Sequence, residues 1–223
     1  MASEWTHAVR FIAEEDGEAH LGQVDPTKWQ DVGLAVSRGQ RVDVNLISGS
    51  LFNGQITDTV LHIALLLSPI APEEVPIIRG IGLNYYGHAK EADLPIPDEP
   101  MLFIKPRTAL IGPSPSLIKI PPFVQDGTSD YEAELAVVLS ESGRDIPEAS
   151  ALDYVLGYVC SNDVSSRRQQ FKDSQVSFSK GLDSSCPLGP VLVSKRAMTN
   201  PDSLRVRALY NGEVVQDFNT RYE

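Results

Sequence analysis

The chain has 223 residues, of which 42% are hydrophobic and 22% charged, and this composition is that of a globular protein and not of a disordered or fibrous one. Thirty acidic residues against 19 Lys and Arg give a formal charge of −11, the wrong sign for binding nucleic acid or an anionic membrane surface. The length allows one large domain, or one domain with a small accessory module.

The first segment, residues 1–72, is predicted to form a small β-rich module. Two strands flank the acidic turn 14–18, and a third alternates so that Val42, Val44 and Leu46 share one face. The predicted strands are Ala8–Ala13, Ala19–Val24 and Arg41–Ile47. A cluster of turn residues at 68–76 marks the expected boundary of this module.

No segment is predicted to cross a membrane or to direct export. The N-terminus lacks a cationic stretch followed by an apolar core, and the longest apolar run, 63–70, is interrupted by Ser68 and Pro69. Cys160 and Cys186 are too few for a disulfide framework and lack the spacing of a metal site. We therefore expect a cytoplasmic protein with reduced thiols.

Residues 73–223 are predicted to form a second, larger domain. Short apolar runs alternate with turns, with brief helical stretches between them, unlike the regular βαβ order of a doubly wound fold. The predicted strands are Pro76–Leu83, Met101–Lys105, Leu117–Ile120, Tyr131–Leu139, Val155–Cys160, Val191–Val193, Leu204–Tyr210 and Glu213–Phe218. The last two flank Asn211-Gly212, a dipeptide typical of hairpin turns. The pattern favours a mainly β (α+β) fold, a mixed β-roll or sandwich.

Two carboxylates stand at the start of one predicted strand. Glu132 and Glu134 are two residues apart, so they point to the same face of the strand. Like charges on one face repel unless a cation lies between them, and oxygen ligands suit Mg²⁺, Mn²⁺ or Ca²⁺. The alternative is a solvated face of an edge strand.

A second group follows the apolar segment that ends in Asn162-Asp163. If Asp163 caps a helix, Arg167 and Gln170 lie on the same helical face and can line a pocket. The alternative is that Asp163 only caps an exposed helix. Further along, Lys180 lies in a turn-rich loop that can present a fixed cation, although a loop lysine is usually solvated.

A third group contains the only histidine that has a carboxylate at catalytic spacing. His88 and Glu91 are three residues apart, so on one helical turn the carboxylate can orient the imidazole as a general base. A surface pair is the alternative. The preceding Gly80 and Gly82 do not begin a dinucleotide-binding loop, because Tyr85 stands where the third glycine belongs.

Taken in chain order, these motifs resemble the fumarylacetoacetate hydrolase family. The resemblance covers roughly residues 79–190, and the order of the motifs makes it specific. They are Gly82-Leu-Asn-Tyr-x-x-His-x-x-Glu91, Phe103-x-Lys105-Pro106, Tyr131-Glu-x-Glu-Leu135, Asn162-Asp-Val-Ser-x-Arg-x-x-Gln170, Lys180-Gly-x-Asp183 and Pro187-x-Gly-Pro190. The likeness continues to Asn211-Gly212-Glu213 and Gln216, to which no role is assigned.

The resemblance implies roles for these residues. Glu132, Glu134 and Asp163 are expected to bind a divalent ion, Mg²⁺ first, with Mn²⁺ or Ca²⁺ as alternatives. The other expected roles are activation of water by His88 with Glu91, stabilisation of negative charge by Lys180, positioning of water or substrate by Gln170, and substrate binding by Arg167 and Tyr85. Family members are often homodimers, so we expect a homodimer.

The resemblance also implies a function. We expect a divalent-metal-dependent hydrolase that cleaves a carbon–carbon bond in a small β-diketo acid such as an acylpyruvate. The same site chemistry would serve decarboxylation of an oxaloacetate-type β-keto acid or keto-enol tautomerisation. In the family a Thr-Gly-Thr-Pro loop and further strands follow the position of Thr220, whereas this chain ends at Glu223, so a roll incomplete at its C-terminal end is expected. A catalytically inactive member that binds a partner or dimerises is the opposing hypothesis.

Overall fold

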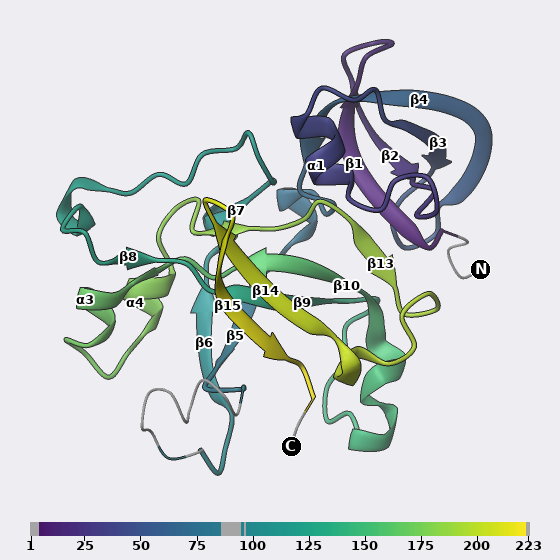
Figure 1. Cartoon of the computed structure of the whole chain (residues 1–223). Coiled ribbons are helices and arrows are strands. Elements are labelled where there is room, and N and C mark those ends of the chain that lie inside the picture. The colour runs from purple at the N-terminus through teal and green to yellow at the C-terminus, as the bar shows by residue number, and fades with distance from the viewer. Residues whose placement is uncertain (1–4, 86–94, 96, 222–223) are drawn as a thin grey trace.

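The structure of the protein is a computed structural model that describes residues 5–85, 95 and 97–221 (Figure 1). It confirms the predicted mainly β class. The strands are β1 His7–Ala13, β2 Ala19–Gln23, β3 Asp43–Ser48, β4 Gln55–Leu67, β5 Ile78–Gly82, β6 Met101–Lys105, β7 Leu110–Ile111, β8 Ser129–Asp130, β9 Ala133–Leu139, β10 Val155–Asn162, β11 Ser165–Ser166, β12 Cys186–Pro187, β13 Leu192–Ser194, β14 Arg205–Tyr210 and β15 Glu213–Asn219. The α-helices are α1 Val32–Ser37, α3 Arg167–Gln170 and α4 Ser177–Lys180.

The four N-terminal strands close on themselves. Strand β1 pairs with both β2 and β4, and β3 pairs with β2 and β4, all antiparallel. Alternate apolar residues of these strands, among them Val9, Phe11 and Val44, fill the interior, and α1 adds Val32 and Ala35 to the same cluster. Figure 1 shows this unit as a compact group of strands with α1 at one side, next to β1.

Strand β1 also connects this unit to the rest of the molecule. It pairs antiparallel with β13, so one seven-stranded sheet runs in the order β2-β3-β4-β1-β13-β10-β9. A second apolar cluster, which includes Trp5, Leu156, Val159 and Leu192, packs where the two groups of strands meet. The expected domain division, 1–72 and 73–223, stays a prediction.

Two features of the secondary structure differ from the sequence analysis. Residues 117–120 were predicted to form a strand but have no regular structure, and Leu117 is 78% exposed. Strand β4 was not predicted, although its 13 residues make it the longest strand described. Its first half carries exposed polar residues such as Asp58 and Thr59, which hide the alternation of its buried half.

The C-terminal hairpin follows the prediction closely. Asn211 and Gly212 both have positive φ, 51° and 87°, as a two-residue turn of the primed type requires. The hairpin lies beside β9, the last strand of the large sheet (Figure 1). It therefore covers part of a sheet edge that also carries the predicted acidic pair.

The fold gives two further findings. Cys160 and Cys186 are both free, as expected. Among the described residues, no helix is both long and apolar enough to span a membrane.

Candidate active site

The lysine expected to stabilise negative charge lies between two of the predicted metal carboxylates. Lys180 Nζ is 2.6 Å from Glu132 Oε2 and 2.7 Å from Asp163 Oδ2. Lys180 and Asp163 are only 4% and 8% exposed, so this is a buried ionic contact and not a solvated loop lysine. It brings together residues 132, 163 and 180, which the sequence analysis placed in three separate motifs.

The predicted substrate-binding arginine lies on the other side of Glu132. Arg167 Nη1 donates a very short hydrogen bond to Glu132 Oε1, and its Nε is 2.8 Å from Asp130 Oδ2. The same Nη1 donates to Gln170 Oε1 at 3.0 Å. The carboxylates raise the pKa of Arg167, although burial opposes them and is the largest single influence. Arg167 therefore fixes Glu132 and Gln170 relative to each other.

Short strands position these side chains. Strand β11 pairs with β8, so Ser165 lies opposite Asp130. Strand β11 ends directly before Arg167. Ser165 Oγ donates to the Asp163 carbonyl at 2.9 Å and approaches Glu132 Oε1 at 3.2 Å. The Arg167 guanidinium and the buried Ser165 hydroxyl therefore both lie against Glu132 Oε1.

The helical arrangement predicted for Asp163 is wrong. Helix α3 begins at Arg167 with Ser166 at its N-cap position, and Asp163 lies between β10 and β11. The Asp163 amide donates to the Glu132 carbonyl at 2.9 Å, so the backbone continues the pairing of β10 with β9 past the strand end. The acidic side chain reaches the site from a strand end and not from a helical face.

Lys105 is a site residue to which the sequence analysis gave no role. Its Nζ lies 2.6 Å from Asp163 Oδ1 and donates to the Val164 carbonyl at 3.3 Å. Burial lowers the pKa of Lys105, while Asp163 acts in the opposite direction. The sequence did contain a signal for this role, since Lys105 belongs to the motif Phe103-x-Lys105-Pro106. In the structure Phe103 and Lys105 are the two buried residues of β6.

Phe103 lies beneath the other lysine. The Lys180 ammonium is 5.1 Å from the centroid of the Phe103 ring, within the range of a cation–π contact. On the opposite strand, Gly80 pairs with Phe103, and a Cβ added there would be 2.1 Å from the ring. The glycine is needed because the ring occupies the space of its missing side chain.

Glu134 faces the same cluster but has a different environment. Burial, the largest influence, together with Glu132 and Asp163 raises the pKa of Glu134 to about 7. A hydrogen bond from Tyr85 and the positive charge of Lys180 act in the opposite direction. The predicted substrate contact Tyr85 thus lies against a predicted metal ligand, and its own pKa is raised, mainly by burial.

The donor set fits a hard divalent cation by its chemistry. Glu132, Glu134 and Asp163 offer carboxylate oxygens, which Mg²⁺ and Mn²⁺ prefer, and the Lys180 ammonium marks a point where one cation reaches both Glu132 and Asp163. Among the described residues, no three acidic, histidine or cysteine side chains already lie close enough together to hold a metal ion.

The remaining predicted site residues are His88 and Glu91. Both lie outside the described residues. Their role in activating water stays a prediction from the sequence.

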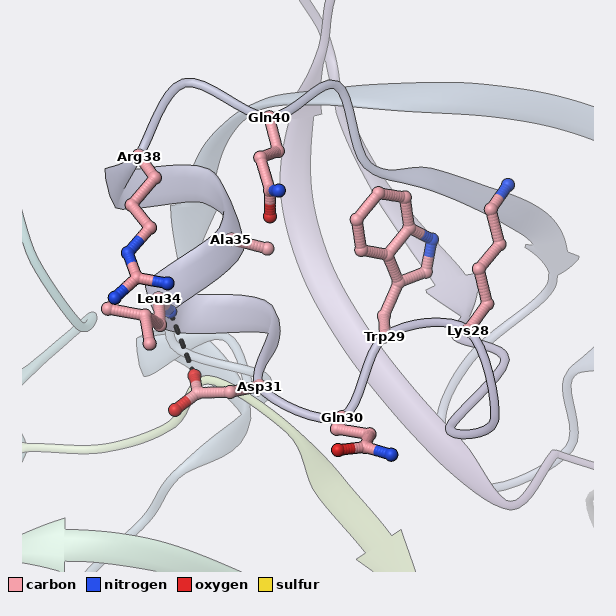
Figure 2. Close-up of a pocket in the computed structure, with 8 residues that line it drawn as sticks. All are labelled: Lys28, Trp29, Gln30, Asp31, Leu34, Ala35, Arg38 and Gln40. Carbon is pink, nitrogen blue, oxygen red and sulfur yellow. Dashed lines mark hydrogen bonds between the residues drawn. The ribbon is translucent and has the colours of Figure 1, made fainter.

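Two pockets lie away from this cluster. One, of about 240 Å³, is formed around α1 and Trp29 (Figure 2). Two of its polar side chains have partners, since Asp31 accepts from the Leu34 amide at 2.8 Å and Lys28 pairs with Asp43 at 2.6 Å. The second, of about 210 Å³, lies beside residues 160–162. In the described part of the chain, no predicted site residue lines either pocket.

Comparison with known proteins identifies the group to which the chain is related. The profile of the family described as "Fumarylacetoacetate (FAA) hydrolase C-terminal" matches residues 77–222, more than half of the chain. The chain belongs to the fumarylacetoacetate hydrolase family. All the described site residues lie within the matched segment.

Relatives within the fumarylacetoacetate hydrolase family carry different activities in their names. The chain is 43% identical over 192 residues to a caffeoylpyruvate hydrolase of Neonothopanus nambi, covering 82% of this chain and 65% of that protein. It is 42% identical over 157 residues to a mitochondrial oxaloacetate tautomerase of Xenopus laevis, covering 70% and 48%. The chain thus spans less than two thirds of the length of these relatives.

A solved structure shares the fold over almost the whole chain. The 5-carboxymethyl-2-hydroxymuconate delta-isomerase of Mycobacterium smegmatis matches with a TM-score of 0.75 at 30% identity, covering 96% of this chain and 75% of that one. The fumarylacetoacetate hydrolase type of fold is therefore confirmed for the N-terminal unit as well as for residues 77–222.

Proposed function

We propose that the protein is a divalent-metal-dependent hydrolase that cleaves a carbon–carbon bond in a small β-diketo acid of the acylpyruvate type. The observation that carries the proposal is the buried contact of Lys180 with both Glu132 and Asp163. It supports a site that concentrates positive charge where an enolate would form. The similarity to a protein named caffeoylpyruvate hydrolase supports the substrate class.

The chain's own residues would divide the work as follows. Glu132, Glu134 and Asp163 would hold Mg²⁺, with Mn²⁺ or Ca²⁺ as alternatives, and the bound ion would offset negative charge on neighbouring substrate oxygens. Lys180 would add a fixed positive charge for the same oxygens. Arg167 holds Glu132 and Gln170 in place and would contact the substrate carboxylate, with Tyr85 at the edge of the site.

The proposed reaction needs one water molecule. His88, oriented by Glu91, would take a proton from water while the water oxygen attacks the distal ketone carbon of the substrate. The bond between that carbon and the methylene carbon then breaks, and its electrons form the enolate of pyruvate. Protonation of the methylene carbon gives pyruvate and a carboxylic acid. Gln170 would position the water.

A second candidate function uses the same enolate without hydrolysis. The similarity to an oxaloacetate tautomerase favours a keto-enol tautomerase, and an oxaloacetate-type decarboxylase would need the same charge arrangement. A small keto acid is the proposed partner in each case. We also propose a cytoplasmic homodimer that binds neither nucleic acid nor membrane, in line with the net charge of −11.

Turnover measurements distinguish these functions. The purified chain should be incubated with acylpyruvates and with oxaloacetate, with EDTA or with added Mg²⁺, and its products identified. The proposal predicts acylpyruvate cleavage that EDTA abolishes and Mg²⁺ restores. Enolisation of oxaloacetate alone would favour the tautomerase, whereas a folded protein that binds the ion but turns over neither substrate would favour the inactive family member.

A further inference from the structure

The motif that ends in Gln216 received no role from the sequence, but the structure places it against the site. Along β15, Gln216 and Phe218 are partly buried and alternate with the exposed Val215 and Asp217. Residues two apart on a strand share a face, so Gln216 and Phe218 both point toward the sheet. The hairpin β14–β15 lies beside β9, which begins directly after Glu132 and contains Glu134.

Gln216 binds the backbone between the two predicted metal carboxylates. The amide of Ala133 donates to Gln216 Oε1 at 2.8 Å. Ala133 separates Glu132 from Glu134, and β9 is the edge of the large sheet, so no strand of that sheet can accept this hydrogen bond. On the other flank, the Glu132 amide donates to Asn162 Oδ1 at 3.0 Å. Side-chain oxygens therefore fix the backbone on both sides of Glu132.

Phe218 acts on the second carboxylate through Tyr85. The two aromatic rings lie 4.5 Å apart between centroids in a tilted arrangement, which is favourable for an aromatic pair. The Tyr85 hydroxyl accepts a long hydrogen bond, 3.5 Å, from the amide of Leu135, the residue directly after Glu134. Leu135 and Ala133 are two apart, so Tyr85 and Gln216 satisfy neighbouring amides on the same edge of β9.

We propose that Gln216 and Phe218 are positioning residues that hold Glu132 and Glu134 in the orientation needed to bind the metal ion. Neither residue is assigned a direct contact with the substrate or the metal ion, because Gln216 acts through the β9 backbone and Phe218 acts through Tyr85. The C-terminal hairpin is then part of the site's supporting shell: β14 packs beside β9, and the Gln216 side chain supplies an acceptor at the edge of β9. The metal-affinity part of this inference rests on the proposed function.

The test compares four variants of the whole chain by two measurements. Gln216→Leu removes the acceptor, Phe218→Leu removes the ring, and Asp217→Asn is the matched control, since Asp217 faces away and pairs with Arg205. Hydrogen exchange of the Ala133 and Leu135 amides reports the backbone contacts without any metal. Calorimetric titration with Mn²⁺ reports the site. Phe218→Tyr keeps the ring and should behave as the parent chain.

We expect Gln216→Leu to exchange the Ala133 amide at least about tenfold faster, and Gln216→Leu and Phe218→Leu to bind Mn²⁺ about 10 to 100-fold more weakly, as is usual for lost supporting contacts. Asp217→Asn should match the parent in both measurements. Unchanged exchange in Gln216→Leu, or Mn²⁺ affinities within twofold of the parent in both Leu variants, would overturn the inference. A parent chain that binds no Mn²⁺ would overturn the proposed function instead, and the exchange rates would still decide whether the hairpin holds β9.

Discussion

Replacing Lys105 by methionine should lower the free energy of unfolding by more than the loss of an exposed ion pair does. The Lys105 ammonium is 2.6 Å from Asp163 Oδ1, and the two side chains are 2% and 11% exposed. Methionine keeps the apolar part of the side chain but leaves Asp163 Oδ1 and the Val164 carbonyl without this donor. Breaking a buried pair from one side costs about 3 to 5 kcal/mol. We expect the lower end of that range, because Asp163 Oδ2 keeps its contact with Lys180.

Urea unfolding of Lys105→Met and of Lys28→Met provides a matched comparison. Lys28 Nζ is also 2.6 Å from a carboxylate oxygen, that of Asp43, but these side chains are 54% and 34% exposed. Exposed pairs contribute about 0 to 1 kcal/mol, so Lys28→Met should change the free energy of unfolding little. Equal losses in the two variants would refute the reasoning that burial decides the cost.

A double variant tests whether the cost comes from an unpaired charge. Apart from Glu134, which forms no ion pair with a described residue, three carboxylates of the site, Asp130, Glu132 and Asp163, pair with three cations, Lys105, Lys180 and Arg167. Lys105→Met leaves one carboxylate in excess, and adding Asp163→Asn restores the balance while its amide oxygen still accepts from Lys180. The double variant should therefore be more stable than Lys105→Met alone. A further loss of stability would contradict this explanation.

Two further predictions concern the same site. Because the pKa of Glu134 is raised to about 7, the folded chain holds the carboxyl proton of Glu134 more tightly than the unfolded chain does. The contribution of this carboxyl group to stability is therefore largest below about pH 4.5 and is lost as the pH rises through 7. The stability of the parent relative to Glu134→Gln should fall by up to about 3 kcal/mol between pH 4.5 and 8 in urea unfolding, and a difference independent of pH would contradict the shift. Gly80→Ala would place a Cβ 2.1 Å from the Phe103 ring, whereas Gly82→Ala meets nothing closer than 3.6 Å. Gly80→Ala should lose about 1 to 3 kcal/mol and Gly82→Ala much less, and the reverse order in thermal unfolding would rule out the close contact as the cause.

The sequence predicted those strands that are specified by residues close to them in the chain. The hairpin β14–β15 was predicted because Asn211-Gly212 specifies its turn, and the β10 segment because its apolar run is continuous. Strand β4 was missed because half of it is polar and is held by pairing with β3, which is a tertiary contact. The apolar run 117–120 was assigned wrongly to a strand, since hydrophobicity alone does not supply a partner strand.

The site residues show the same limit. Spacing placed Glu132 and Glu134 on one face, and the order of the motifs linked them to Asp163 and Lys180, which the structure brings into contact. No local pattern shows that Lys105 reaches Asp163 across 58 positions of sequence. Gln216 lies 83 positions from Ala133, and no local pattern shows that the hairpin brings its side chain to the Ala133 amide.

Calorimetric titration of the whole chain with Mn²⁺, beside Glu134→Ala and the control Glu141→Ala, tests whether Glu132, Glu134 and Asp163 bind a metal ion. Glu141 lies exposed in the loop after β9, so its removal takes away one carboxylate without changing the site. We expect one Mn²⁺ bound per parent chain, the same binding in Glu141→Ala, and none in Glu134→Ala. No binding by the parent, or equal binding by Glu134→Ala, would contradict the assignment of Glu132, Glu134 and Asp163 to a metal ion.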